Sequence, residues 1–130
     1  MRIRDFKYDI LIIDDSLFIK KLLTEIIELK GYTCKTVNKI SLAMQELETY
    51  LPKLILLDVN LPDSSGYDFC KNLKSTEKFK NVLIYYFTGV TEAEIAIKTL
   101  ETKADGYLKK PFKISEFNNI FELINQINSA

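Results

Sequence analysis

The chain alternates short, continuously apolar runs with longer segments whose apolar residues recur at helical spacing. The first run, Ile10-Leu11-Ile12-Ile13, is apolar at every position, which is typical of a strand covered on both faces of its sheet. Runs of this kind, bounded by turn residues, predict five strands. They span residues 8–14, 32–37, 53–58, 82–87 and 106–109.

Helical patterns fill the segments between and after these strands. Residues 17–30 carry apolar side chains at positions 18, 22, 26 and 29, one face of a helix that ends at Gly31. Further helices are predicted over 41–51 and 66–76, and a fourth opens at Thr91. Ser65 with Asp68, and Thr91 with Glu94, are spaced as capping boxes. The fifth helix has an apolar stripe at Ile114, Phe117, Phe121, Ile124 and Ile127.

Five strands that alternate with five helices predict an α/β fold, a doubly wound parallel sheet with helices on both faces. At 130 residues the chain has the size of one domain, and no linker or internal repeat divides it. We therefore expect a single domain over residues 1–130.

Composition and charge narrow the function classes. Lys plus Arg and Asp plus Glu each number 18, so the formal net charge is zero, which disfavours direct binding to nucleic acid or to an anionic membrane. No apolar run approaches the roughly 18 residues of a membrane span, and the N-terminus lacks the apolar core of a secretory signal. Cys34 and Cys70 fit no metal spacing, and we expect them to be reduced in a cytoplasmic protein.

The chain contains no histidine. This excludes a histidine-based zinc site and a Ser-His-Asp triad. It also excludes a phosphohistidine carried by this chain.

Polar side chains stand where the predicted strands end. Asp14 and Asp15 close the first strand and Asp58 the third, whereas Thr88 follows the fourth and Lys110 the fifth. Ligands of a doubly wound sheet bind outside the carboxyl ends of its strands, so we expect these five side chains on one rim. Carboxylates suit a hard divalent cation such as Mg²⁺, and lysine and threonine can donate hydrogen bonds to phosphate oxygens.

Asp14 and Asp15 also have a simpler explanation, since acids at the start of a helix can cap it. That explanation leaves the acid, hydroxyl and ammonium on the other strands unexplained. Two adjacent carboxylates at the rim of a core repel each other unless a cation lies between them. We predict that this cation is a metal ion.

Four motifs together resemble the receiver domain of bacterial two-component response regulators. They are "IIDDS", "LILLDVNLPDSSGYD", "YYFTG" and "GYLKKPF", and the resemblance covers essentially the whole chain. It implies the flavodoxin-like strand order 2-1-3-4-5. It also implies that a histidine kinase or histidine phosphotransfer protein donates a phosphoryl group in a Mg²⁺-dependent reaction. The chain would then be a phosphoacceptor that assists its own phosphorylation and dephosphorylation, rather than an enzyme.

The resemblance assigns roles to the acids. Asp58 is similar to the phosphoacceptor of the family, which attacks the phosphoryl group as a nucleophilic carboxylate. Asp15, Asp58 and the backbone carbonyl of Asn60 resemble direct Mg²⁺ ligands. Asp14 resembles the acid that holds the metal through water.

The remaining roles concern the response to phosphorylation. Lys110, rather than Lys109, resembles the lysine that pairs with the phosphoacceptor, and the family places a cis peptide between it and Pro111. Thr88 resembles the hydroxyl that moves toward the phosphate, and Tyr107 the aromatic side chain that rotates with it. These movements would switch the face formed by the fourth helix, fifth strand and fifth helix, which a partner or output domain recognises.

Two positions depart from the family pattern. Lys103 stands where a helix-ending glycine is common, so a non-glycine residue must take the left-handed conformation or the turn must differ. Lys113 stands where an aspartate often follows the "KPF" motif.

Other functions remain open at this point. The chain could be a stand-alone receiver, or a receiver cut from a longer DNA-binding regulator or hybrid kinase. A Mg²⁺-dependent aspartyl-phosphate hydrolase would place its nucleophile as D-x-D after the first strand, whereas this chain has "DDS". A flavin or nucleotide module needs a phosphate-binding loop there, and "DDSLFIK" supplies none.

Overall fold

The computed structural model describes residues 8–129, so residues 1–7 and 130 of the predicted domain lie outside the described part. The strands form one parallel sheet in the order β2-β1-β3-β4-β5, which confirms the predicted fold and strand order. Their bounds are β1 (Ile10–Ile13), β2 (Cys34–Val37), β3 (Leu54–Leu57), β4 (Leu83–Thr88) and β5 (Gly106–Lys109).

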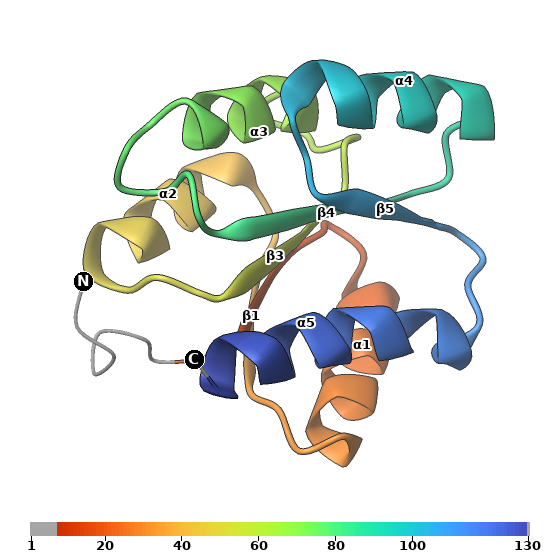
Figure 1. The fold of residues 1–130 in the computed structure, drawn as a ribbon. Helices are drawn as coiled ribbons and strands as arrows, with labels where there is room; N and C mark the ends of the chain where they lie inside the picture. Colours follow the sequence, from red (N-terminus) through yellow and green to blue (C-terminus); the bar gives the residue numbers. More distant parts are fainter. Residues whose placement is uncertain (1–7, 130) are drawn as a thin grey trace.

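Helices cover both faces of this sheet. Figure 1 shows α1 and α5 on one face and α2, α3 and α4 on the other. The bounds are α1 (Leu17–Leu29), α2 (Ile40–Thr49), α3 (Gly66–Lys74), α4 (Glu92–Thr102) and α5 (Asn118–Ser129), with a short 3-10 helix, η2 (Ile114–Phe117), before α5. None of the helices within residues 8–129 has the length and apolar character needed to span a membrane.

The all-apolar strands lie at the centre of the fold. Every residue of β1 and of β3 is buried, and the two strands pair in parallel with Ile10 opposite Leu54. Successive side chains of a strand point to opposite faces. Leu11 and Ile55 therefore pack in the core beneath α2 to α4, whereas Ile12 packs in the core beneath α1 and α5. Both faces need apolar residues, which explains the uninterrupted runs.

The apolar face predicted for the first helix is partly wrong. Phe18 and Leu29 are 72% and 85% exposed, whereas the buried residues of α1 are Leu23, Ile26 and Ile27. Apolar residues occupy most of the circumference of α1, so the spacing alone could not select the side that meets the sheet.

The stripe predicted for the last helix also needs correction at its start. Phe117, Phe121 and Ile124 are buried, but Ile114 is 56% exposed. The segment begins as the 3-10 helix η2 instead of a first turn of α5, so Ile114 falls outside the α-helical stripe. Ile127 is half-buried.

Ser65 and Thr91 are the N-cap residues of α3 and α4, which confirms the hydroxyl half of each predicted capping box. The Ser65 hydroxyl accepts a hydrogen bond from the Asp68 backbone N–H at 3.5 Å, and Thr91 accepts one from Glu94 at 3.2 Å. The Glu94 carboxylate accepts a further bond, at 2.7 Å, from the hydroxyl of Tyr67 on α3. This contact joins the first turns of the two helices.

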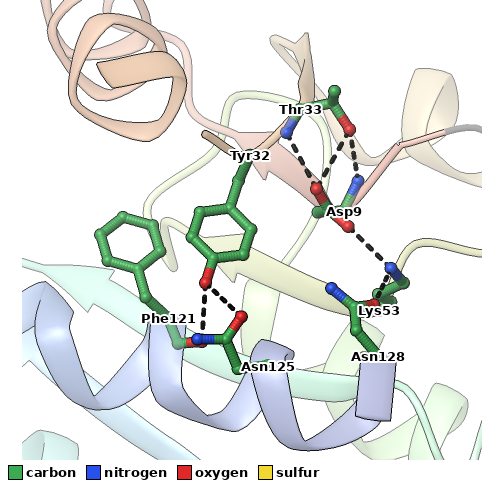
Figure 2. A network of polar contacts seen from close by, with 7 residues as sticks. All are labelled: Asp9, Tyr32, Thr33, Lys53, Phe121, Asn125 and Asn128. Carbon is green, nitrogen blue, oxygen red and sulfur yellow. Dashed lines mark hydrogen bonds and ion pairs between the residues drawn. The ribbon is translucent and has the colours of Figure 1, made fainter. Parts of the chain in front are cut away.

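A network of polar contacts connects the segments that lead into β1, β2 and β3, at the edge where these strands begin (Figure 2). The Asp9 carboxylate accepts hydrogen bonds from the Thr33 backbone N–H at 2.9 Å and from the Lys53 ammonium at 2.8 Å. Nearby, the Tyr32 hydroxyl donates to the Asn125 side chain at 2.7 Å, which ties α5 to the start of β2. The predicted functional side chains lie at the opposite edge of the sheet, where the strands end.

Lys103 takes the left-handed conformation, the first of the two alternatives that its place in the family pattern left open. It follows α4 with φ 63° and ψ 29° and is exposed.

We expect Lys103→Gly to raise the free energy of unfolding by about 1 kcal/mol, since glycine has no Cβ to clash in this conformation. Urea unfolding measures this change. Lys30→Gly is the matched control, because Lys30 caps α1 at φ −87° and the substitution should lower stability there. A loss of stability in both variants would contradict the expectation.

Candidate functional site

Three acids meet at the carboxyl ends of β1 and β3. Asp14 and Asp15 directly follow β1, and Asp58 directly follows β3. One carboxylate oxygen from each lies within 4.8 Å of the others. Asp14 and Asp58 are only 1% and 7% exposed, whereas Asp15 is exposed. The parallel pairing of β1 with β3 brings the acids together, since it sets the two strand ends side by side.

The helix-cap explanation for these acids does not describe the structure. Ser16 is the N-cap of α1, and its hydroxyl accepts a hydrogen bond from the Ile19 backbone N–H at 3.2 Å. The Asp14 carboxylate accepts one from the Ser16 backbone N–H at 2.9 Å, with its Oδ1 atom. Asp14 therefore stabilises the turn before the helix, and its other oxygen, Oδ2, contacts the Lys110 ammonium.

Lys110 brings a positive charge to the acids. Its Nζ atom lies 2.9 Å from Asp14 Oδ2 and 3.6 Å from Asp58 Oδ2. The ammonium also lies over the Phe87 ring, 5.1 Å from the centroid, where the aromatic face stabilises a cation. These contacts fix the side chain between β1, β3 and β4.

The neighbouring lysine points elsewhere. The Lys109 ammonium bonds the backbone carbonyl of Val90, in the loop between β4 and α4. The Lys110–Pro111 peptide is cis, as the resemblance implied, and the Lys110 backbone N–H donates to the Thr88 carbonyl at 2.9 Å. The structure thus agrees with the choice of Lys110 over Lys109 as the lysine that faces the acids.

Burial is the main influence on the pKa of Asp58, the acid at the centre of the site. It raises the pKa of Asp58 above its usual range, because water no longer solvates the charge. A backbone hydrogen bond from Asn60, at 3.1 Å, and the Lys110 ammonium lower this pKa, whereas the charges of Asp14 and Asp15 raise it. The ionised form of Asp58 therefore carries an energetic cost that a further cation would offset.

The donor set suits a hard divalent cation. All three side chains offer carboxylate oxygens, the ligands that Mg²⁺ prefers, and one lysine leaves three carboxylates incompletely neutralised. Asp15 is exposed, so water can complete the coordination of a small ion. Asn60 adjoins the cluster through its bond to Asp58, which keeps its backbone close to the acids.

Thr88 and Tyr107 lie on the neighbouring strands but are not part of the acid cluster. Thr88 is the last residue of β4 and is fully buried, and its hydroxyl accepts a weak hydrogen bond from the Val90 backbone N–H at 3.4 Å. The Tyr107 hydroxyl donates to the carboxylate of Glu92, the first residue of α4, and this bond raises the pKa of the tyrosine. Tyr107 therefore contacts α4, and the rotation of its side chain on phosphorylation stays a prediction.

Phe87 and Glu92 are contacts that the sequence did not single out. Phe87 stands beside Thr88 in an aromatic run, and only the pairing of β4 with β5 shows that it lies below the lysine. Glu92 could have been noticed as an acid in the first turn of a helix, but nothing in its spacing connects it to Tyr107.

Comparisons with known proteins agree with this geometry. A family model for the response regulator receiver domain matches residues 10–122. The phosphate regulon transcriptional regulatory protein PhoB of Escherichia coli is 33% identical over 107 residues, which cover 82% of this chain and 47% of PhoB. The DNA-binding response regulator MtrA of Mycobacterium leprae is 31% identical over 82% of this chain and 46% of its own. The chain thus spans about half the length of these curated relatives.

Solved structures give the same fold. The signal receiver domain of a signal transduction histidine kinase from Syntrophus aciditrophicus has a TM-score of 0.85 at 27% identity and covers 95% of this chain and 94% of its own. A putative response regulator from Chloroflexus aurantiacus has a TM-score of 0.84 at 26% identity over 91% of this chain and 98% of its own.

Proposed function

Since the chain belongs to the response regulator receiver domain family of two-component systems, we propose that it accepts a phosphoryl group on Asp58 from a phosphohistidine of a histidine kinase or phosphotransfer protein. The observation that carries this proposal is the meeting of Asp14, Asp15 and Asp58 with Lys110 at the carboxyl edge of the sheet. The direct test is phosphorylation of Asp58 by a small phosphoryl donor such as acetyl phosphate in the presence of Mg²⁺.

The reaction needs little covalent chemistry from the protein. A carboxylate oxygen of Asp58 attacks phosphorus, the bond between phosphorus and the histidine nitrogen breaks, and the nitrogen keeps the electron pair. Bound Mg²⁺, held by Asp15, Asp58 and the Asn60 carbonyl, and through water by Asp14, would neutralise charge on the phosphoryl oxygens. Lys110 would then move from its acid partners to a phosphoryl oxygen, and the Thr88 hydroxyl would donate to another.

Dephosphorylation follows from the same arrangement. The product at Asp58 is a mixed anhydride, and attack by water on phosphorus returns the carboxylate and releases phosphate. The exposure of Asp15 leaves the edge of the site open to water. The protein therefore acts as a phosphoacceptor that assists both steps on itself, rather than as an enzyme with a separate substrate.

An apolar groove beside Lys110 supports a protein donor. Phe18, Leu22, Phe112 and Ile114 line it together with Lys110, and its lining is almost free of polar surface. Phe18 and Ile114 are 72% and 56% exposed although both are large and apolar. We assign this groove to the phosphohistidine-carrying partner, because a protein that binds there lies next to Lys110 and hence beside Asp58.

Phe18→Ala should separate the two kinds of donor. We expect it to slow phosphoryl transfer from a phosphohistidine protein about tenfold, the loss of one buried interface aromatic, and to leave transfer from acetyl phosphate unchanged. Leu100→Ala on α4 is the control, since Leu100 is 82% exposed on the other face of the sheet. Rapid-quench transfer assays measure both rates. Equal rates for Phe18→Ala and the wild type with the protein donor would remove the groove from the proposal.

The face of α4, β5 and α5 would report the phosphorylated state. Movement of Thr88 toward the phosphoryl group would leave space that Tyr107 fills after leaving Glu92. PhoB and MtrA are named as transcriptional or DNA-binding regulators and extend well beyond the matched part, so the second candidate is a receiver module of a longer DNA-binding regulator. We place the reaction in the cytoplasm, since the two cysteines are free thiols.

A further inference from the structure

The loop between β3 and α3 carries Asp58 and Asn60, and Asp63 connects this loop to α2. We propose that Asp63 is a positioning residue for the cation site, which holds the loop so that the Asn60 backbone faces Asp58 and the bound metal. This inference rests on the proposed function, because it adds a residue to the same site. Asp63 is exposed and does not belong to the cluster of three acids.

The carboxylate of Asp63 bonds two backbone groups at the start of α2. Its Oδ1 atom accepts from the Ile40 N–H at 3.0 Å, and its Oδ2 atom accepts from the Ser41 N–H at 3.0 Å. These bonds lower the pKa of Asp63, the Ser41 N–H most strongly, so the carboxylate stays ionised. Lys39, at the N-cap position of α2, makes no capping bond with its side chain. The cap of α2 therefore comes from the loop of the site.

The other end of the loop is fixed by close backbone contacts. Asn60 and Ser65 form an antiparallel bridge, and a Cβ atom on Gly66 would lie 2.8 Å from Val59 Cα, so only glycine fits there. The Asn60 N–H donates to Asp58 within this bridge-closed loop. Asp63 lies between Asn60 and Ser65, where its bonds to α2 fix the part of the loop that the bridge does not reach. Loss of these bonds would leave the tip of the loop, between Asn60 and Ser65, without its contact to α2, and the position of Asn60 would then depend on the bridge and the bond to Asp58 alone.

The competing explanation is that Asp63 only caps α2 and does not position the loop. A substitution at Lys39 can distinguish these two explanations. Lys39 has φ −162° and ψ 163°, extended backbone of the kind that N-cap residues adopt. A serine at this position can accept a hydrogen bond from the first turn of α2. Lys39→Ser in the Asp63→Ala background therefore restores a cap to the helix without reconnecting the loop.

Calorimetric Mg²⁺ titration and urea unfolding in chelator test the proposal on the same proteins. We expect Asp63→Ala to bind Mg²⁺ about tenfold more weakly, as for other residues that orient metal ligands. Adding Lys39→Ser should return the unfolding midpoint toward that of the wild type and leave Mg²⁺ binding weak. Asp68→Ala, which removes a nearby exposed acid of α3, should bind Mg²⁺ like the wild type. Asp63→Asn keeps one acceptor oxygen and replaces Asp63→Ala if the alanine variant does not fold.

Unchanged Mg²⁺ affinity in Asp63→Ala, or affinity restored by Lys39→Ser, would overturn the proposal. Failure of the wild type to bind Mg²⁺ would instead refute the proposed function. In that case the amide chemical shift of Asn60 in the metal-free protein still tests whether Asp63 positions the loop. A chemical shift that differs from the wild type in Asp63→Ala, and still differs after Lys39→Ser is added, supports the positioning role. An Asn60 shift equal to that of the wild type refutes it.

Discussion

Incubation with acetyl phosphate and Mg²⁺ is expected to add one phosphoryl group to the wild-type protein and none to Asp58→Asn. In the proposed reaction, the Mg²⁺ that the acids would hold and the Lys110 ammonium would neutralise the charge of the phosphoryl oxygens. A partner would then need only to present its phosphohistidine, and a small high-energy donor could replace it. The Asn60 N–H already bonds the Asp58 carboxylate and orients it at the edge of the sheet. Intact-mass spectrometry with time measures the gain.

Three controls make the assignment specific. A chelator should abolish the gain, because three carboxylates and the phosphoryl oxygens cannot share one lysine charge. Hydroxylamine should remove the group, since it cleaves a mixed anhydride. Asp68→Asn, an exposed acid close in sequence, should be phosphorylated like the wild type. A phosphoryl group that still appears on Asp58→Asn would move the nucleophile elsewhere and refute the central proposal.

The sequence predicted the acid cluster because it depends on only two general properties. Uninterrupted apolar runs mark buried parallel strands, and parallel strands place their carboxyl ends at one edge. Asp14, Asp15 and Asp58 needed no other information to be grouped. Lys110 required more, because two adjacent lysines follow β5 and spacing does not decide which one faces the acids. The resemblance to the family supplied that choice.

Contacts that depend on side-chain packing could not be predicted from the sequence. The buried side of α1 is set by its fit to the sheet, so a pattern with apolar residues around most of the helix misplaced Phe18 and Leu29. The two bonds from Asp63 to α2 join groups 23 and 22 residues apart, and "LPDSSG" is equally typical of an ordinary turn. The contact between Tyr107 and Glu92 is similar, since only the pairing of β5 with β4 sets the tyrosine beside the start of α4.

Without metal, Asp58→Asn should be more stable than the wild type, although we expect that it cannot be phosphorylated. Asp58 is buried beside two like charges, and asparagine keeps an oxygen that can accept the Asn60 N–H bond while it removes the charge. We expect the free energy of unfolding in chelator to rise by about 1–2 kcal/mol at pH 7, in the range of other substitutions that relieve a functional site. Mg²⁺ should stabilise the wild type and have little effect on the variant.

The pH dependence of this difference tests its electrostatic origin. Burial raises the pKa of Asp58 in the folded protein above its usual value of 3.8, so well above the raised pKa the folded state bears the full cost of the charge. As the pH falls through the raised pKa, the folded protein binds a proton before the unfolded chain does, and that cost disappears. Urea unfolding in chelator should therefore show the advantage of Asp58→Asn shrinking between pH 7 and about pH 4. An advantage that is constant over this range would mean that asparagine stabilises the protein by packing rather than by removing a charge, and a variant less stable than the wild type at pH 7 would mean that Lys110 already neutralises the cluster without a metal.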